Sequence, residues 1–201
     1  MLCSTVHMRL FVALDIDEHV HDRIRQFMDA VRGLAPDVRW VSAESLHVTL
    51  KFIGEQPDAN VSRIENVLRT ISVKPFQISF RGSGFFPTEK SARVFWIGIE
   101  AGAALAELAA QIEHALVPLG IAAEKRAFSP HLTLARAREG SGAPGKQRGD
   151  RPNRRFSALH SKLSTLPASE FGTMNAAEFF LYRSQLSSHG AQYTKIARFA
   201  L

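Results

Sequence analysis

The chain has 201 residues, 45% of them hydrophobic and 22% charged, so it can bury the core of one domain or of two closely packed lobes. Its formal net charge of +6 favours partners that carry phosphate, because Lys and Arg gain from attraction to a polyanion and from counterion release. The single cysteine, Cys3, excludes an intrachain disulfide and indicates a reducing, cytoplasmic setting, and no apolar run reaches the ~20 residues that a membrane span requires.

Short strands and amphipathic helices are mixed along the chain. We expect residues 1–7 to form a disordered leader and residues 8–201 to form one domain. Hydrophobic periodicity predicts strands at 9–15, 38–41, 46–53, 76–86, 93–100, 128–137, 177–184 and 193–199, and helices at 18–34, 61–73, 103–119 and 156–166. Several strands are joined by connections of hairpin length. This favours an α+β fold with antiparallel sheets over a doubly wound parallel sheet.

The segment 139–155 differs in composition from the rest of the chain. It is rich in Gly, Pro, Arg and Lys and has no apolar period, so we expect a basic flexible loop. Between residues 136 and 155 seven Arg and Lys side chains stand against two acids, and much of the net charge is therefore concentrated there. The role of this loop stays open.

A tetrapeptide of the form His-x-Thr-Leu occurs twice, as His47-Val48-Thr49-Leu50 and as His131-Leu132-Thr133-Leu134. Both copies fall inside predicted strands, where residues two apart share a face and their neighbours point the other way. Each strand therefore has an apolar back for the core and a His-Thr front turned toward a cleft. Strict alternation puts Lys51 on the first front. It puts Arg136 on the apolar face of the second motif strand, so that Arg136 reaches the cleft only if the strand bends or ends first.

Two such fronts provide what hydrolysis of a phosphodiester needs. Imidazole changes charge near neutral pH, so one histidine can accept a proton from water while the other, protonated, delivers one to a leaving oxygen. A Thr hydroxyl can donate to a non-bridging phosphate oxygen, where charge builds up in the transition state. The residues predict an acid–base site made of His47, Thr49, His131 and Thr133, with no metal and no cofactor. A zinc site on the two histidines lacks a third ligand at suitable spacing.

At these residues the chain resembles the two-histidine (2H) phosphoesterase superfamily. It is most similar to the bacterial and archaeal branch of RNA 2′,3′-cyclic phosphodiesterases, also called LigT-like proteins or 2′-5′ RNA ligases. The resemblance runs nearly from end to end and rests on the stretches 9–14, 39–55, 128–136 and 181–184. It implies a bilobal α+β fold, in which two pseudo-symmetric lobes of antiparallel sheet, with helices packed outside, flank a central cleft and each contribute one motif.

The resemblance also implies an activity, the hydrolysis of a 2′,3′-cyclic phosphate at an RNA end to a 2′-phosphate. It implies that His47 is the proton donor and His131 the proton acceptor, which the residues alone do not decide, and that members can also join RNA ends through a 2′-5′ linkage. Arg136 matches a family position that contacts phosphate. Phe11 is a candidate for stacking on an unpaired base, with core packing as its alternative. The expected partner is RNA with a cyclic phosphate end, such as a tRNA fragment, and the expected state is a monomer.

Two other functions are compatible with the sequence. The first is a non-catalytic nucleotide or RNA-binding module that uses the histidines only as donors. The presence of both complete motifs argues against it, because binding alone does not require two proton shuttles. The second is an esterase for a small cyclic nucleotide or for a 2′-5′ oligonucleotide. A comparison of turnover on a mononucleotide with turnover on an RNA end would separate this function from hydrolysis of a cyclic phosphate at an RNA end.

Overall fold

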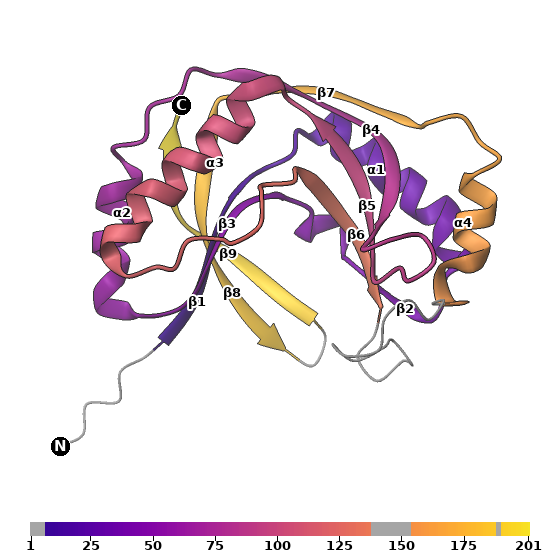
Figure 1. Ribbon diagram of the computed structural model, residues 1–201, viewed down its shortest axis with the longest axis horizontal. Helices are drawn as coiled ribbons and strands as arrows, with labels where there is room; N and C mark the ends of the chain where they lie inside the picture. The colour runs from indigo at the N-terminus through magenta and orange to yellow at the C-terminus, as the bar shows by residue number, and fades with distance from the viewer. Residues whose placement is uncertain (1–6, 138–153, 188–189) are drawn as a thin grey trace.

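In the computed structural model, two antiparallel sheets with helices on their outer sides form the molecule (Figure 1). The structure describes residues 7–137, 154–187 and 190–201. The strands are β1 (His7–Leu14), β2 (Val38–Trp40), β3 (Val48–Pro57), β4 (Phe76–Phe86), β5 (Val94–Glu100), β6 (His131–Ala137), β7 (Glu170–Ala176), β8 (Glu178–Ser187) and β9 (Gly190–Ala200). The helices are α1 (Glu18–Val31), α2 (Asp58–Leu68), α3 (Gly102–Leu116) and α4 (Ser157–Leu163).

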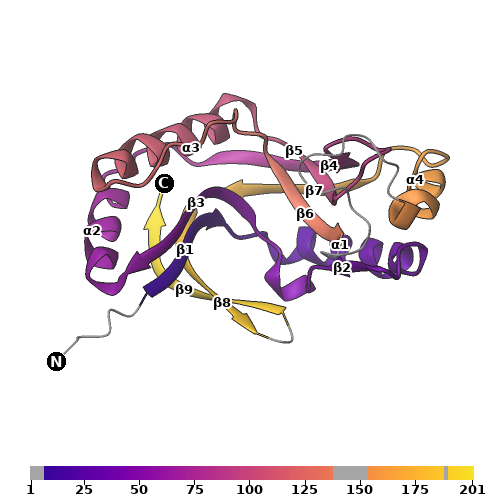
Figure 2. The ribbon, with the colours of Figure 1, turned by 60° about the horizontal axis from the view of Figure 1, so that its bottom comes forward.

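The sheets draw on both halves of the chain. Sheet A has the strand order β3-β1-β8-β9, and sheet B has the order β2-β6-β5-β4-β7. The early strand β2 therefore lies in sheet B, while the last two strands complete sheet A. Helices α2 and α3 pack beside β3 of sheet A, and α1 packs against β7 of sheet B. Figures 1 and 2 show the two sheets side by side, each with its own helices. The expected α+β architecture of two lobes, with one motif in each, is confirmed.

Each helix contributes one apolar stripe to the core. The buried residues of α1 recur at helical spacing and turn toward sheet B, namely Val20, Ile24, Met28 and Val31. Those of α3 do the same against sheet A, namely Leu105, Leu108, Ala109, Ile112 and Leu116. None of the helices in the described ranges is both long enough and apolar enough to cross a membrane.

Several predicted boundaries need correction. The first strand begins at His7, inside the leader expected at 1–7, and residues 1–6 lie outside the described residues. Most of the expected loop 139–155 also lies outside them, but its last two residues belong to a 3-10 turn at Arg154–Phe156. The strand β7 was not predicted. Its Gly172 has φ +118° and its pairing with β4 is irregular beside Phe80, so its apolar residues do not alternate strictly.

Candidate active site

The two motif histidines stand where strands of the two sheets begin. His47 directly precedes β3 in sheet A, and His131 is the first residue of β6 in sheet B. Nδ1 of each ring lies 2.8 Å from the carbonyl oxygen two residues earlier in the chain, which belongs to Ser45 and to Ser129 respectively. A carbonyl oxygen only accepts hydrogen bonds, so Nδ1 carries a proton in both rings. Nε2 of each histidine is therefore the nitrogen that can exchange a proton with a ligand. Both histidine side chains are half-buried.

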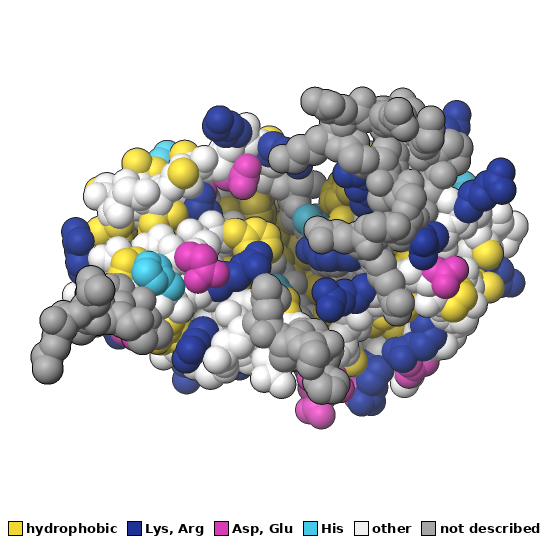
Figure 3. All heavy atoms as spheres, turned by 90° about the horizontal axis from the view of Figure 1, so that it is seen from below, with side chains coloured by type: hydrophobic (Ala, Val, Ile, Leu, Met, Phe, Trp, Pro, Cys, Tyr) yellow, Lys and Arg dark blue, Asp and Glu magenta, His cyan; other side chains and the backbone are white. Residues whose placement is uncertain are grey.

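The positive charge of Arg136 acts on both motif histidines. Burial is the largest cause that lowers the pKa of His47 and of His131, and the positive charge of Arg136 lowers both further. The two motif strands also contact each other directly, since β3 of sheet A packs against β6 of sheet B. Figure 3 shows a hollow on this face, with histidine and hydrophobic side chains inside it and Lys and Arg side chains along one rim.

Each motif strand carries a β-bulge directly after its threonine. The register of β3 with β1 skips Leu50, and the register of β6 with β5 skips Leu134. An extra residue on one strand reverses the face of the residues that follow it. His131 and Thr133 lie two apart in β6 before the bulge and therefore share one face, whereas His47 directly precedes β3. The faces of the residues that follow each bulge are exchanged.

The bulges overturn two expectations from strict alternation. Lys51 lies on the core side and is 6% exposed. Its Nζ lies 2.8 Å from Oε2 of Glu113 and donates to the Ala122 carbonyl at 2.8 Å, so it does not reach the cleft rim. Arg136 turns to the cleft side instead of the back, and its Nη2 donates to Oγ1 of Thr133 at 3.4 Å. The strand bends at the bulge, which was the condition for Arg136 to reach the cleft.

Aromatic rings surround His47 on sheet A. Its ring centroid lies 4.8 Å from that of Phe11, 5.1 Å from that of Tyr193 and 6.2 Å from that of Tyr182. Phe11 is also stacked on Tyr182 at 5.0 Å and is only 3% exposed. This packing leaves Phe11 no free ring face for a base, so the geometry supports its packing role and not the stacking role considered for it.

An acid distinguishes the surroundings of His47 from those of His131. The negative charge of Asp15 and the hydrogen bond to the Ser45 carbonyl raise the pKa of His47 against the larger effect of burial. No carboxylate in the described part of the chain has this effect on His131. Asp15 accepts a hydrogen bond from the Tyr182 hydroxyl and forms an ion pair with Lys195. Burial and this acid raise the pKa of Tyr182, so its hydroxyl keeps its proton.

Sequence reasoning did not identify Asp15, Tyr182 or Tyr193 as site residues. The available signal was the alternation along β1, which places Asp15 on the same face as Phe11 and Ala13. Tyr182 and Tyr193 lie more than 130 residues further along the chain, and nothing in the local sequence indicates that β8 and β9 complete this sheet. Their contribution therefore becomes visible only in the folded chain.

Sheet B presents its own set of side chains beside His131. The ring of Phe86 meets that of His131 edge-on at 5.0 Å, and Trp96 is paired with Thr133 in the register of β5 and β6. The register of β2 and β6 pairs Arg39 with Arg136, so two exposed guanidinium groups lie next to each other on this face. Positive charge thus accumulates on the side of the site that sheet B provides.

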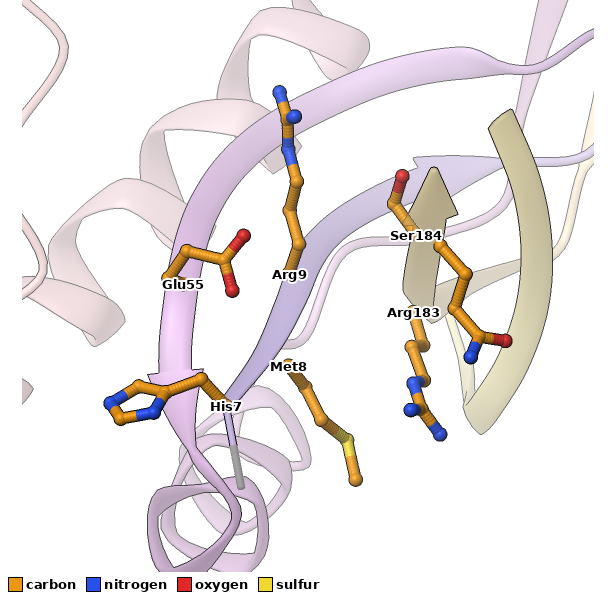
Figure 4. A pocket seen from close by; sticks show the side chains of 7 residues that line it. His7, Met8, Arg9, Glu55, Arg183 and Ser184 are labelled. Carbon is orange, nitrogen blue, oxygen red and sulfur yellow. The ribbon is translucent and has the colours of Figure 1, made fainter. Parts of the chain in front are cut away.

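A separate hollow lies at the outer end of β1 and contains neither motif. It is lined by His7, Met8, Arg9, Glu55, Arg183, Ser184 and Gln185. Figure 4 shows the Arg9, Glu55 and Ser184 side chains on one side of the strands and those of Met8 and Arg183 on the other. Within the described ranges, no group of three or more His, Cys, Asp or Glu side chains is arranged to hold a metal ion.

Comparisons with known proteins agree with this geometry. The family model described as LigT like Phosphoesterase matches residues 14–96 and again 97–193, one match for each motif. Proteins named RNA 2′,3′-cyclic phosphodiesterase from Methanothermobacter thermautotrophicus and from Archaeoglobus fulgidus are each 33% identical to the chain, over 96% of it and 99% of their own length.

Solved structures show the same fold. TT0787 of Thermus thermophilus has a TM-score of 0.75 at 28% identity and covers 96% of this chain and 98% of its own. E. coli LigT complexed with 3′-AMP has a TM-score of 0.76 at 24% identity, with 98% and 99% covered, and shows the fold alone. The resemblance inferred from the two motifs is confirmed. The chain belongs to the LigT-like phosphoesterase family.

Proposed function

We propose that the chain is an RNA 2′,3′-cyclic phosphodiesterase, which opens the cyclic phosphate to a 2′-phosphate by acid–base catalysis without a metal ion. The observation that carries this proposal is the pairing of two imidazoles, each held through Nδ1 by a carbonyl two residues before it, with one arginine, Arg136, acting on both. Relatives whose names state this activity match nearly the whole chain.

The proposed reaction needs one proton transfer on each side of phosphorus. Nε2 of His131 accepts a proton from water while the water oxygen bonds to phosphorus. The bond from phosphorus to O3′ breaks, and Nε2–H of His47 protonates O3′. The hydroxyls of Thr49 and Thr133 and the guanidinium of Arg136 donate to the non-bridging oxygens, which gain charge in the transition state. A 5′-hydroxyl in the place of water would yield a 2′-5′ linkage by the same two transfers.

The surroundings of the histidines support the assignment of their roles. A carboxylate near an imidazolium stabilises it, and so do aromatic ring faces. His47 has Asp15 and the ring of Phe11, so it is the one suited to hold a proton for the leaving oxygen. The positive charge of Arg136 acts on His131, and no acid in the described part of the chain offsets it, which favours the neutral form of His131. We therefore assign His47 as the acid and His131 as the base.

The proposal extends to the state and the substrate of the enzyme. Both motifs lie in one chain, which supports activity as a monomer. The net charge of +6 supports RNA ends, such as those of tRNA fragments, over uncharged substrates. The single cysteine supports a cytoplasmic location.

The test is hydrolysis of an RNA with a 2′,3′-cyclic phosphate end in the presence of a chelator, followed by identification of the phosphate position. We expect a 2′-phosphate product. His47→Ala and His131→Ala should each lower the rate about 10²- to 10⁴-fold, as expected for loss of a general acid or base. His114→Ala, on the exposed side of α3, is the matched control and should keep full activity. A requirement for a divalent metal, or full activity of His131→Ala, would refute the proposal.

A further inference from the structure

A short crossover, residues 41–47, carries the chain from sheet B to the first motif histidine. At its start the Val41 N–H donates to the Leu134 carbonyl at 2.8 Å, which extends the pairing of β2 with β6, the second motif strand. At its end stands His47, six residues after Val41 and directly before β3 of sheet A. The conformation of this crossover therefore contributes to where His47 lies relative to the strand that carries His131.

The middle of this crossover is a 3-10 turn, Ala43–Ser45, to which the His47 ring is hydrogen-bonded. The Leu46 N–H closes the turn by donating to the Ala43 carbonyl at 3.1 Å. The last carbonyl of the turn, that of Ser45, lies 2.8 Å from Nδ1 of His47. The position of this one oxygen fixes the tautomer of His47, and with it the direction in which Nε2 points.

His21 of α1 holds this turn from the other side of the molecule's sequence and fold. Its Nε2 lies 2.8 Å from the Ala43 carbonyl, 22 residues away in the chain. Because a carbonyl oxygen only accepts, Nε2 of His21 carries the proton and donates. Oδ1 of Asp22 lies 3.9 Å from the other ring nitrogen, and the His21 side chain is 24% exposed. Since α1 packs against β7 of sheet B, His21 connects the turn before His47 to the lobe that carries His131.

We propose that His21 is a positioning residue for His47, because by holding the Ala43 carbonyl it fixes the turn to which the His47 ring is hydrogen-bonded. This inference rests on the proposed role of His47 as the general acid, and His21 acts through the turn and not on the substrate. General acid catalysis requires Nε2 of His47 to point at the leaving oxygen, and a displacement of about 1 Å can lower the rate about 10²-fold. Nε2–H donates both in this neutral tautomer and in the imidazolium, so the contact does not depend on the charge of His21.

A second histidine of the same helix provides the matched control. Nε2 of His19 also reaches a backbone carbonyl, that of Thr173 in β7, at 3.1 Å. Both histidines belong to α1 and both bind a carbonyl far away in the chain, but β7 is an edge strand of sheet B and carries neither motif. A contribution that came only from fastening α1 to the fold would appear in both histidines, whereas an effect on His47 should come from His21 alone.

The experiment compares two amides at position 21 that differ in reach. The Gln amide extends about as far as Nε2 of an imidazole, and the Asn amide does not. With an RNA that ends in a 2′,3′-cyclic phosphate, His21→Asn should lower kcat about 10- to 10²-fold. KM should stay nearly constant, because the donors to the phosphate oxygens remain in place. His21→Gln should restore most of kcat, and His19→Ala should match the wild-type protein.

NMR of the ring nitrogens, at a pH where both motif histidines are neutral, gives a second measurement that does not depend on turnover. In the wild-type protein His47 and His131 should both carry the proton on Nδ1. His21→Asn should give a mixture of the two tautomers of His47 and leave His131 unchanged, since Ser129, and not the turn that His21 holds, accepts from that ring. His21→Gln should restore the Nδ1–H form of His47.

The outcomes separate the positioning role from the proposed function. If the wild-type protein opens no cyclic phosphate, the proposed function fails, and the tautomer of His47 in His21→Asn still tests the positioning. If the wild-type protein is active and His21→Asn keeps its kcat, the enzyme stands and the positioning role is overturned. An equal loss in His21→Asn and His19→Ala would also overturn it, because His21 would then act only by fastening α1. His21→Leu, which keeps a good helix former and lacks a donor, should behave like His21→Asn, and thermal unfolding checks that each variant is folded.

Discussion

The guanidinium of Arg136 donates to Oγ1 of Thr133 at 3.4 Å, although strict alternation along a strand would point these side chains in opposite directions. The bulge at Leu134 brings them to the same face. The shared orientation of Thr133 and Arg136, which we propose to bind the phosphate, therefore depends on a backbone irregularity as well as on residue type. The positive charge of Arg136 also lowers the pKa of both histidines.

Replacing Arg136 should change both histidines at once. Its positive charge lowers the pKa of His47 and of His131, so Arg136→Met should raise the pKa of both rings in an NMR titration. The same change removes a donor to the transition state and should lower kcat/KM about 10²-fold. Arg136→Lys keeps the charge and should leave both pKa values closer to those of the wild-type protein. A shift confined to His131 would show that the two imidazoles do not share one site.

Of the two motif histidines, only His47 should respond to replacement of Asp15. Its negative charge raises the pKa of this histidine, so Asp15→Asn should lower that pKa, because the imidazolium loses its stabilising carboxylate. The pKa of His131 should stay nearly constant. Asp29→Asn, which removes an exposed acid paired with Arg32 on α1, is the matched control and should move neither value. Equal shifts of both histidines after Asp15→Asn would contradict the asymmetry on which the acid and base roles rest.

The pH dependence follows from the direction of both pKa shifts. Burial is the largest cause and holds the pKa of His47 and of His131 below the ordinary 6.5. In the proposed mechanism the active form has His47 protonated and His131 neutral, and its population is greatest midway between the two pKa values. The profile of kcat/KM should therefore be a bell with its maximum below pH 6.5. Bound phosphate adds negative charge that raises both values, so the profile of kcat should lie at higher pH. A kcat/KM maximum above pH 7 would contradict this description.

Periodicity and the repeated tetrapeptide predicted the two motif strands, the shared face of each His-Thr pair and the antiparallel α+β architecture. The bulges were not predictable in the same way. In β6 the adjacent buried residues Leu134 and Ala135 break the period of two, and this was a usable signal. In β3 the residue in that place is Lys51, which is buried only because Glu113 of α3 pairs with it. A local pattern does not reveal a partner that only the folded chain brings near.

A close contact in sheet B should make Gly84 intolerant of a side chain. A Cβ built on Gly84 would lie 2.4 Å from Cζ2 of Trp96, so Gly84→Ala must displace the indole. Overpacking of this kind costs about 1–3 kcal/mol, which thermal unfolding can measure. Activity should also fall, since Trp96 is the register partner of Thr133. Gly33→Ala, where a Cβ meets no atom within 4 Å, should leave both stability and activity unchanged.

The buried ion pair behind β3 should hold together the segment that leads from α3 to His131. Nζ of Lys51 meets the Glu113 carboxylate and the Ala122 carbonyl, and the same carboxylate accepts the N–H of Glu124. Lys51→Met leaves a carboxylate and a carbonyl without their cationic donor, which should lower the free energy of unfolding by about 2–4 kcal/mol.

Urea unfolding of the single and double variants measures this coupling. Lys51→Met combined with Glu113→Gln should be more stable than Lys51→Met alone, because no buried charge is then left unpaired while the Glu124 N–H keeps an acceptor. Arg69→Met breaks a more exposed pair with Glu65 and should cost under about 1 kcal/mol. If Lys51→Met costs no more than Arg69→Met, the buried pair does not anchor this segment. A loss of activity in Lys51→Met that the double variant restores would show that the pair also positions His131.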